Sequence, residues 1–543
     1  MTDIEIPFEK DRHGHYRFFE ILPGFLSWTL LFLPIILSFI NVTVAVFFIL
    51  FYLLVYFVRS LGFSIGSLRG YRTMKNHLKL DWEALVDDVE NRRVGNGSHR
   101  PQWHKDNIER LNTSSNDYKP SELIHAVIVA TVNESREVLE PTVQSIIEGL
   151  QDNMKIILVI AYEGRAGEET EKRVLSLIED YKNEFMDIFA VKHPANQPGE
   201  IIGKGANISC AGRQLKNYLE EKNIDPKKVI VTTLDADNRP DKRYFLAINY
   251  LYCIVPDPIR ASYQPLPMFT NNIWDAPTMM RVIATGNTLF YIVGVTRPHR
   301  ARNFSAHAQS MQALIDMNFW STRTVVEDGH HFWRSYFHFN GDYRVYPLTI
   351  PVYQDAVLAD GYIKTIRAQF IQLRRWTYGA SDVAYVADKG FFTKNAIPKS
   401  DLLAKFFNLL EGHVTWAVGT ILVFGAAFIP PLIHPQSFAA NELPLIVSRI
   451  QKIGLLGLLA TVFVCLVTLP PRPARYKRHR SILMVVQWVL TPVTGVLFGS
   501  LAAFNSQTRL MFKKYLSKFD VTEKAVVVGG GEVVSSEADP GGH

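Results

Sequence analysis

Long apolar runs alternate with polar stretches along this chain, and they fall in two clusters. No Asp, Glu, Lys, Arg or His occurs from Ile21 to Val58, a stretch that as one helix would run roughly 57 Å at about 1.5 Å per residue. Because the hydrocarbon core of a bilayer is only about 30 Å thick, this pattern predicts two spans that fold back near Ile40 to Thr43. Three further runs lie late in the chain, Val414 to Ile433, Ile453 to Leu469 and Ile482 to Phe504. Together the runs predict a multi-pass membrane protein.

Basic side chains flank the first pair of predicted spans. Lys10, Arg12 and Arg17 precede the pair and Arg59 and Arg69 follow it, whereas the turn between the spans has none. By the positive-inside rule, both outer ends and the polar middle of the chain are predicted to be cytoplasmic, in an inner or plasma membrane. These flanks account for the net charge of +6, and the sequence has no aromatic-interleaved basic patch that would bind nucleic acid.

The polar middle of the chain repeats short apolar runs, each followed by a stretch with helical spacing. The runs are rich in β-branched residues and comprise Leu123 to Ala130, Lys155 to Tyr162 and Lys227 to Leu234. Strands that alternate with helices favour right-handed crossovers and a parallel sheet covered on both faces. The pattern therefore predicts an α/β, Rossmann-like domain with a mostly parallel sheet, inserted between α-helical transmembrane segments.

Polar residues follow the ends of these predicted strands. They are Asn133 and Glu134 after the first strand, Glu163 after the second, and Asp235 and Asp237 after the third. In parallel sheets ligands bind outside the carboxyl ends of the strands, so these side chains are expected to converge on one polar edge. Asp and Asn also form ordinary turns at such places, and only the cluster favours a site.

Asp235 and Asp237 stand one residue apart in the stretch TLDADNRP. Paired hard oxygen ligands suit Mg²⁺ or Mn²⁺, which usually take further ligands from substrate phosphates. The spacing therefore fits a diphosphate-binding site, and an ordinary Asp-rich turn is the alternative.

Two later motifs carry further candidate chemistry. Glu327 and Asp328 end a β-branched run in TVVEDGHHFW, where a partly desolvated carboxylate can act as a general base. Gln372, Arg375 and Trp376 lie in QFIQLRRWTYG, which has the spacing of a helix. Arg offers a planar fork for phosphate oxygens and Trp a flat face on which a sugar can stack. A basic amphipathic helix at a membrane surface remains the alternative for this second motif.

In their order along the chain, TVNES, GKGANIS, LDADN, VVED and QLRRW resemble the motifs of membrane-embedded family 2 glycosyltransferases. This group includes the cellulose, hyaluronan and chitin synthases and ceramide glucosyltransferase. The resemblance covers about residues 121 to 380. It implies a GT-A fold and the inverting transfer of a sugar from a nucleotide-diphosphate donor, most simply a UDP-sugar.

Carried over residue by residue, the resemblance implies that Asp235 and Asp237 bind the donor diphosphate and the metal, Mg²⁺ or Mn²⁺. Asp328 would be the base, with Glu327 beside it. Further matched positions are Asn133, Glu134, Glu163, Lys204 and Arg375 on the donor side and Gln372 and Trp376 on the acceptor side. Glu163 stands where the family has Asp-Asp-Gly, and Val326 stands where it has Thr.

The stretch KFDVTEK near the end of the chain also matches this family. Phe519, Val521, Thr522 and Lys524 fit Phe-x-Val-Thr-x-Lys, the gating-loop motif of processive synthases. The preceding stretch TRLMFKKYLSK fits an amphipathic interfacial helix. For this motif to reach a cytoplasmic site, an even number of crossings must precede it, so the run 482–504, which contains Pro492, is predicted to be a re-entrant or surface hairpin.

These patterns divide the chain into six parts. They are a cytoplasmic N-terminus with a transmembrane hairpin at 1–75, a linker at 76–120, the GT-A domain at 121–400, membrane segments at 401–505, the interfacial helix and gating-loop-like motif at 506–527, and a disordered tail at 528–543.

Three functions fit the sequence. The first is a processive polysaccharide synthase that also secretes its growing glycan. The second is a glycolipid synthase that transfers one sugar to a membrane lipid, and the third is a non-catalytic transporter or pseudoenzyme. The first two require a nucleotide-sugar donor, a glycan or lipid acceptor and surrounding membrane lipids, and the sequence leaves the oligomeric state open.

Overall fold

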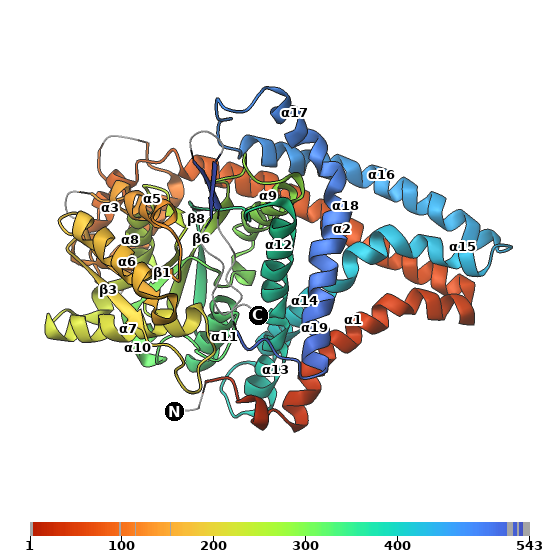
Figure 1. Ribbon diagram of the computed structural model, residues 1–543, viewed down its shortest axis with the longest axis horizontal. Helices are drawn as coiled ribbons and strands as arrows, with labels where there is room; N and C mark the ends of the chain where they lie inside the picture. Colours follow the sequence, from red (N-terminus) through yellow and green to blue (C-terminus); the bar gives the residue numbers. More distant parts are fainter. Residues whose placement is uncertain are drawn as a thin grey trace.

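The computed structural model describes residues 4–96, 99–114, 116–151, 154–518, 525–528 and 532–535. It has two parts, a sheet domain and a bundle of long helices that projects to one side of it (Figure 1). The bundle helices are α1 (Gly14–Ile40), α2 (Val42–His77), α14 (Lys399–Gly425), α15 (Ile429–Ile433), α16 (Phe438–Val467), α17 (His479–Val486), α18 (Thr491–Thr494) and α19 (Leu501–Met511).

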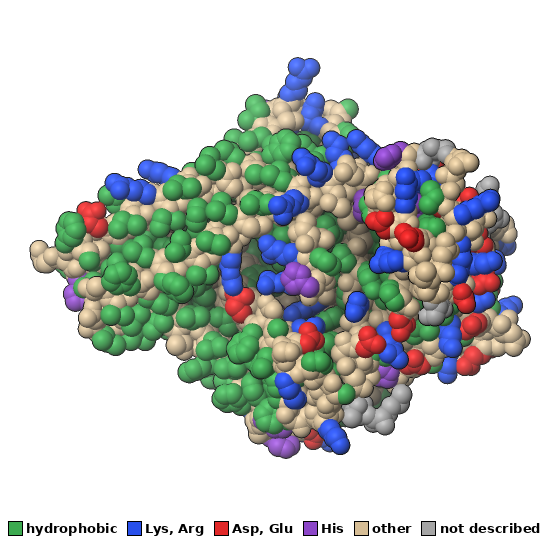
Figure 2. Space-filling view, turned by 180° about the vertical axis from the view of Figure 1, so that it is seen from behind, with side chains coloured by type: hydrophobic (Ala, Val, Ile, Leu, Met, Phe, Trp, Pro, Cys, Tyr) green, Lys and Arg blue, Asp and Glu red, His purple; other side chains and the backbone are tan. Residues whose placement is uncertain are grey.

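Hydrophobic side chains cover much of the bundle on the face shown in Figure 2, whereas charged side chains gather over the sheet domain. Within the described ranges, five helices are long and apolar enough to cross a membrane: Gly14–Ile40, Val42–His77, Lys399–Ile433, Phe438–Val467 and His479–Met511. The predicted fold-back lies at Asn41, which ends α1 and whose side chain accepts hydrogen bonds from the backbone N–H groups of Thr43 and Val44 at the start of α2.

The sheet domain contains one mixed sheet with the strand order β3-β2-β1-β4-β7-β6-β8-β5. Its strands are β1 (Ile124–Thr131), β2 (Lys155–Glu163), β3 (Asp187–His193), β4 (Val229–Asp235), β5 (Arg239–Pro240), β6 (Ala261–Phe269), β7 (His307–Ser310) and β8 (Arg344–Gln354). β1 to β4 run parallel, β7 runs antiparallel to β4 and β6, and β8 runs parallel to β6. The predicted α/β class with helical apolar segments is confirmed.

Helices lie on both faces of this sheet. Those of the sheet domain that contact its strands are α5 (Arg136–Glu148), α6 (Glu168–Tyr181), α7 (Lys204–Glu221), α8 (Tyr244–Ile254), α9 (Thr278–Gly294) and α10 (Met311–Asp316). The helices α3 (Trp82–Glu90) and α4 (Gln102–Thr113) pack on α8, and α11 (Glu327–His338) packs against α7. The helices α12 (Tyr362–Thr377) and α13 (Asp382–Ala387) pack against the bundle.

The packing of the central strand β1 shows why its sequence is mostly apolar. Val127 and Val129 belong to the core that β1 shares with α5, α6 and α8, whereas Ala126 and Ile128 belong to the core that it shares with α7 and α10. A strand buried on both faces has no polar side to alternate with, and its residues are therefore mostly apolar. The exception inside the run, His125, is buried, and its Nε2 lies 2.8 Å from Oδ1 of Asn249 on α8.

The segment predicted as a linker, residues 76–120, is instead part of the sheet domain. It contains α3 and α4, and Trp82, Leu85, Ile108 and Leu111 from these helices belong to the same core as β1 and α8. An amphipathic helix over DWEALVDDVEN agrees with α3, whereas α4 escaped prediction because its apolar residues are few among polar ones.

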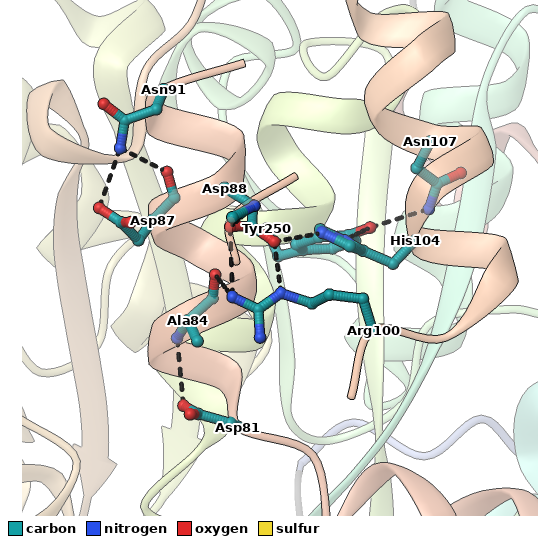
Figure 3. Close-up of polar contacts among 10 residues, drawn as sticks. Asp81, Ala84, Asp87, Asp88, Asn91, Arg100, His104, Asn107 and Tyr250 are labelled. Carbon is teal, nitrogen blue, oxygen red and sulfur yellow. Dashed lines mark hydrogen bonds and ion pairs between the residues drawn. The ribbon is translucent and has the colours of Figure 1, made fainter. Parts of the chain in front are cut away.

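A buried polar cluster fastens α3 and α4 to α8 (Figure 3). Asp88 of α3 pairs with the guanidinium of Arg100 and accepts a hydrogen bond from Nε2 of His104 (2.9 Å), whose Nδ1 lies 2.9 Å from Tyr250 Oη. Burial raises the pKa of Asp88, but hydrogen bonds from Arg100, the Gly95 N–H and His104 outweigh it and hold that pKa below its ordinary value.

The fifth apolar run is not a hairpin. The chain is helical from His479 to Met511, with a 3₁₀ turn at Gln487–Leu490 and a wider π turn at Gly495–Ser500. The run contacts the sheet domain near both ends, because Arg480 donates to the Trp274 carbonyl and Ser506 donates to the Arg374 carbonyl. Pro492 fits without a reversal of the chain since it lies in the first turn of α18.

The end of the chain also differs from prediction. The helix expected over Thr508 to Lys518 stops at Met511, and Lys513 has a positive φ of 56°. Two short antiparallel strands, β9 (Ala525–Val528) and β10 (Glu532–Ser535), lie where a motif and a tail were expected. The matched residues Phe519, Val521, Thr522 and Lys524 lie outside the described residues.

Replacing Asp88 by Asn is expected to lower the free energy of unfolding by about 3 to 5 kcal/mol at neutral pH, because it leaves the Arg100 guanidinium buried without its carboxylate. The lowered pKa means that this stability is present above the unfolded pKa of about 3.9 and is lost as pH falls through the lower folded value. Thermal unfolding of the full chain in detergent measures the difference.

The matched control is Asp87→Asn, on the neighbouring, exposed position of α3. Equal unfolding midpoints for the two variants would contradict the structural role given to Asp88.

Candidate active site

The ammonium group of Lys204 lies between two carboxylates that come from different elements. Its Nζ is 2.8 Å from Oδ1 of Asp235, at the end of β4, and 3.6 Å from Oδ1 of Asp328, at the start of α11. It also donates to the Ser305 carbonyl (3.1 Å). The Lys204 side chain is only 7% exposed, and burial alone would lower its pKa. Asp235, Asp328 and Glu327 outweigh that effect and raise the pKa, so Lys204 stays charged.

Close packing at the start of α7 puts Lys204 in this position. Nδ2 of Asn207 donates to the carbonyl of Ala161 (3.0 Å) and to that of Thr131 (3.4 Å), which ties α7 to the carboxyl ends of β2 and β1. At Gly205 a Cβ atom would come within 2.5 Å of the Ser321 carbonyl. Only glycine allows α7 to begin this close to the loop that leads into α11.

Glu327 and Asp328 are the first two residues of α11. The pKa of each is raised, first of all by burial. Asp328 raises the pKa of Glu327 further, whereas Lys204 and Arg375 lower both. Neither carboxylate oxygen of Glu327 accepts a hydrogen bond from another residue in the part of the chain that the structure describes. Two acidic groups are thus held close together, with two basic side chains as their counter-charges.

The helix α12 carries the three residues of the QLRRW motif. Arg375 interacts electrostatically with Glu327 and Asp328, so the structure brings it to the same site. Oε1 of Gln372 accepts a hydrogen bond from Gln369 of its own helix (3.1 Å). The ring of Trp376 packs against that of Phe269, at the end of β6, with the ring centroids 6.0 Å apart.

The two aspartates after β4 differ in their surroundings. Asp235 has a 32% exposed side chain, whereas Asp237 is buried and its Oδ2 accepts a hydrogen bond from the Asp355 N–H (3.1 Å). Their hard oxygens fit Mg²⁺ or Mn²⁺. The described ranges hold no group of three or more His, Cys, Asp or Glu that would hold a metal.

Three predicted residues have other contacts. Oε2 of Glu134 accepts from Thr131 Oγ1 and the Val132 N–H (both 2.7 Å) and so stabilises the loop after β1. The Asn133 carbonyl accepts from Arg173 of α6. Glu163 lies 3.2 Å from Nδ1 of His193, at the end of β3. Glu163 and His193 thus form a second polar cluster, which lies at the carboxyl ends of β2 and β3.

Glu200 is a second acidic neighbour of His193. Nε2 of His193 lies 3.0 Å from Glu200, while Glu163 lies 3.7 Å from Arg165. Burial would lower the pKa of His193, but the two glutamates raise it above its ordinary value.

Sequence reasoning missed Ser305 and Asp355. Ser305 acts through its backbone carbonyl, which no side-chain motif reveals. Asp355 directly follows the strand β8, whose run RVYPLTIPVYQ is largely apolar, so the strand-end rule that found Asp235 also applies to it. The prolines in that run concealed the strand.

The chain end reaches this site as well. Lys518 pairs with Ile202 in an isolated parallel bridge, and Ile202 lies two residues before Lys204.

No protein-family model and no curated protein matches this chain. Similar solved structures include a mannosyltransferase from Pyrobaculum calidifontis in complex with GDP-Man and Mn²⁺, which is 14% identical with a TM-score of 0.38 over 83% of this chain and 100% of that one. They also include residues 1–349 of S. aureus TarS, alone and with UDP, 10% identical with a TM-score of 0.33 over 76% of this chain and 96% of that one. At TM-scores below 0.5, these similarities do not by themselves establish a shared activity.

Replacing Glu327 by Gln is expected to raise the unfolding temperature at pH 7 by on the order of a few degrees. The folded chain favours the protonated carboxyl, so the ionised form costs stability above the unfolded pKa of about 4.3. The gain should vanish below about pH 4, where the carboxyl carries its proton in both states. Thermal unfolding in detergent at both pH values measures it.

Glu169→Gln, on the exposed first turn of α6, is the control and should show no gain at either pH. A Glu327→Gln variant that is less stable than the parent at pH 7 would contradict this account.

Proposed function

We propose that this chain is a membrane glycosyltransferase of the GT-A type that moves a sugar from a nucleotide-diphosphate donor to an acceptor hydroxyl with inversion. The observation that carries the proposal is the position of Lys204, which joins Asp235 to Asp328. In the resembled family these two carboxylates serve the donor and the acceptor, respectively. One buried ammonium group therefore lies close to both the donor-side and the acceptor-side carboxylate.

On the donor side, Asp235 and Asp237 would hold Mg²⁺ or Mn²⁺ together with the diphosphate oxygens. The ion would supply positive charge where the nucleotide departs. Arg375 interacts with the acidic pair at the start of α11, which supports its role as a planar cation for the leaving diphosphate. Glu163 with His193 at the ends of β2 and β3 would lie toward the nucleotide base, most simply a uracil.

On the acceptor side, Asp328 would take the proton of the acceptor hydroxyl as that oxygen attacks the anomeric carbon. A raised pKa makes Asp328 a stronger base than an ordinary aspartate. The negative charge of Asp235 raises the pKa of Asp328 further, after burial, and adds to that basicity. Gln372 and Trp376 on α12 would line the acceptor, with the Trp ring as a stacking face.

The product we propose is a polysaccharide that the enzyme extends processively and exports across the membrane, with the sheet domain in the cytoplasm. The approach of Lys518 to Ile202 supports this proposal, because the gating-loop-like motif begins at the next residue, Phe519. The transfer of one sugar to a membrane lipid is the second candidate.

The test gives membranes that contain the full chain labelled UDP-glucose, UDP-GlcNAc and other nucleotide sugars with Mg²⁺ or Mn²⁺. One of these donors should be converted into product, and chelation of the metal with EDTA should prevent the conversion. Sizing separates the candidates, since a processive synthase gives long polymer and a glycolipid synthase gives a single-sugar lipid. No transfer from any donor would favour a transporter or pseudoenzyme and would overturn the proposal.

Replacing Asp328 by Asn is expected to reduce the transfer rate by about 10²- to 10⁴-fold, the usual contribution of a general base. Binding of the nucleotide, measured by titration of the purified chain, should change little, since Asp235 and Lys204 remain. Asp342→Asn, at an exposed position paired with Arg260, is the control. An active Asp328→Asn enzyme would exclude the proposed base.

A further inference from the structure

The segment of residues 512–518, here called the C-terminal segment, touches one loop of the candidate site. Its last residue, Lys518, pairs with Ile202 in the parallel bridge. Ile202 and Gly203 lead directly into Lys204, the first residue of α7. The backbone on which the buried ammonium depends is therefore held in part by a segment more than three hundred residues away.

The same segment touches the second loop of the site. Tyr515 and Leu516 pack in one apolar cluster with Val325 and Val326. These two valines directly precede Glu327, the start of α11. The C-terminal segment therefore contacts two loops of the site. One loop leads into Lys204 and the other leads into Glu327.

A buried carboxylate of α1 holds this segment in place. Glu20 is only 1% exposed, and its Oε2 accepts a hydrogen bond from the phenol of Tyr515 (2.8 Å). Oε1 accepts from Nη1 of Arg12 (3.3 Å), and Arg17 pairs with Oε2. Burial, and then Glu20, raise the pKa of Tyr515 to about 12, so the phenol keeps the proton that it donates.

The two arginines add contacts of their own to the chain end. The Arg12 guanidinium lies 4.7 Å above the ring of Tyr515. Arg17 donates to the carbonyl of Leu510 (2.6 Å) and to that of Met511, which satisfies acceptors left open where α19 ends. Glu20 is thus the common partner of Arg12, Arg17 and Tyr515, and it anchors the point from which the C-terminal segment starts.

We propose that Glu20 is a positioning residue for the site around Lys204, acting through the C-terminal segment; the proposal rests on the proposed transferase function. With the Glu20 contacts intact, Tyr515 keeps the segment against the loops that carry Lys204 and Glu327. Without them the segment leaves Ile202, and the Lys204 loop loses its neighbouring strand. Since Lys204 faces the donor-side carboxylate, donor binding suffers before the chemical step.

Replacing Tyr515 by Phe tests this with the smallest change, because the ring under Arg12 remains and only the hydrogen bond to Glu20 is lost. We expect KM for the nucleotide sugar to rise roughly threefold to tenfold with little change in kcat. Glu20→Gln should raise KM at least as much, because it also weakens the pairs with Arg12 and Arg17, and adding Tyr515→Phe to it should change little more, because both changes act on the same Glu20–Tyr515 contact.

A cross-link reports the position of the segment without using activity. Neighbouring strands lie about 4.8 Å apart, within the Cα range of about 4.4 to 6.8 Å that disulfides accept. With Cys210, Cys253 and Cys465 replaced, the pair Ile202→Cys and Lys518→Cys should oxidise efficiently in the full chain. Adding Tyr515→Phe should reduce the yield severalfold.

The matched control is Tyr181→Phe, which removes another phenol-to-carboxylate hydrogen bond, to Glu140 on the far side of the sheet domain. It should change neither KM nor the cross-link. An active Tyr515→Phe enzyme with parental KM and parental cross-linking would overturn the role of Glu20 and leave the transferase proposal standing. A chain whose cross-link falls in Tyr515→Phe but that transfers no sugar would overturn the transferase proposal while supporting the contact.

Discussion

A buried ammonium group that faces two carboxylates is the interaction on which the site depends. Removing Lys204 from water is costly unless opposite charges are close, and Asp235 and Asp328 supply them from opposite sides. These carboxylates in turn are tolerated at low exposure because Lys204 is there. The end of β4 and the start of α11, which the sequence separates by more than ninety residues, are thereby fixed relative to each other.

The position of Lys204 also depends on contacts with the helices of the bundle. Its position follows from the start of α7, which Gly205 allows to pack closely and which Asn207 ties to two strand ends. The loop before α7 is paired with the C-terminal segment, and α19, from which that segment emerges, is tied to α1 through Trp28 and Thr508 (2.9 Å). The sheet domain and the apolar helices therefore share one network of contacts, and the site lies where they meet.

β1, β2 and β4 were predictable from sequence because strands buried on both faces give largely apolar runs, whereas the partly exposed edge strand β3 was not predicted. β6 and β8 were not, since Pro265, Pro267, Pro347 and Pro351 interrupt them and proline normally argues against an inner strand. In β6 and β8 the register shifts between Gln264 and Leu266, an irregularity at which proline is tolerated.

The site was predictable to the extent that its chemistry follows strand ends. That rule located Asp235 and Asp237, whereas Lys204 was found only through the family resemblance. Glu20 was beyond reach, because its contact with Tyr515 joins positions 495 residues apart and both residues look like ordinary members of a membrane flank. Periodicity reports which face of an element is buried, but it does not report which distant element covers it.

Burial, and after it the crowding of negative charge, raises the pKa values of Glu327 and Asp328. Asp235, Asp237, Glu327 and Asp328 would carry four negative charges if all were ionised, against one from Lys204 and one from Arg375. The protein answers part of this excess by raising the pKa of Glu327, first through burial and then through the neighbouring Asp328, which favours a proton on that one carboxyl. A site of this kind disfavours a bare diphosphate, whose charge would add to the excess, and favours one that arrives together with a divalent cation. In the proposed transferase, this excess of negative charge would therefore select the form in which the donor binds.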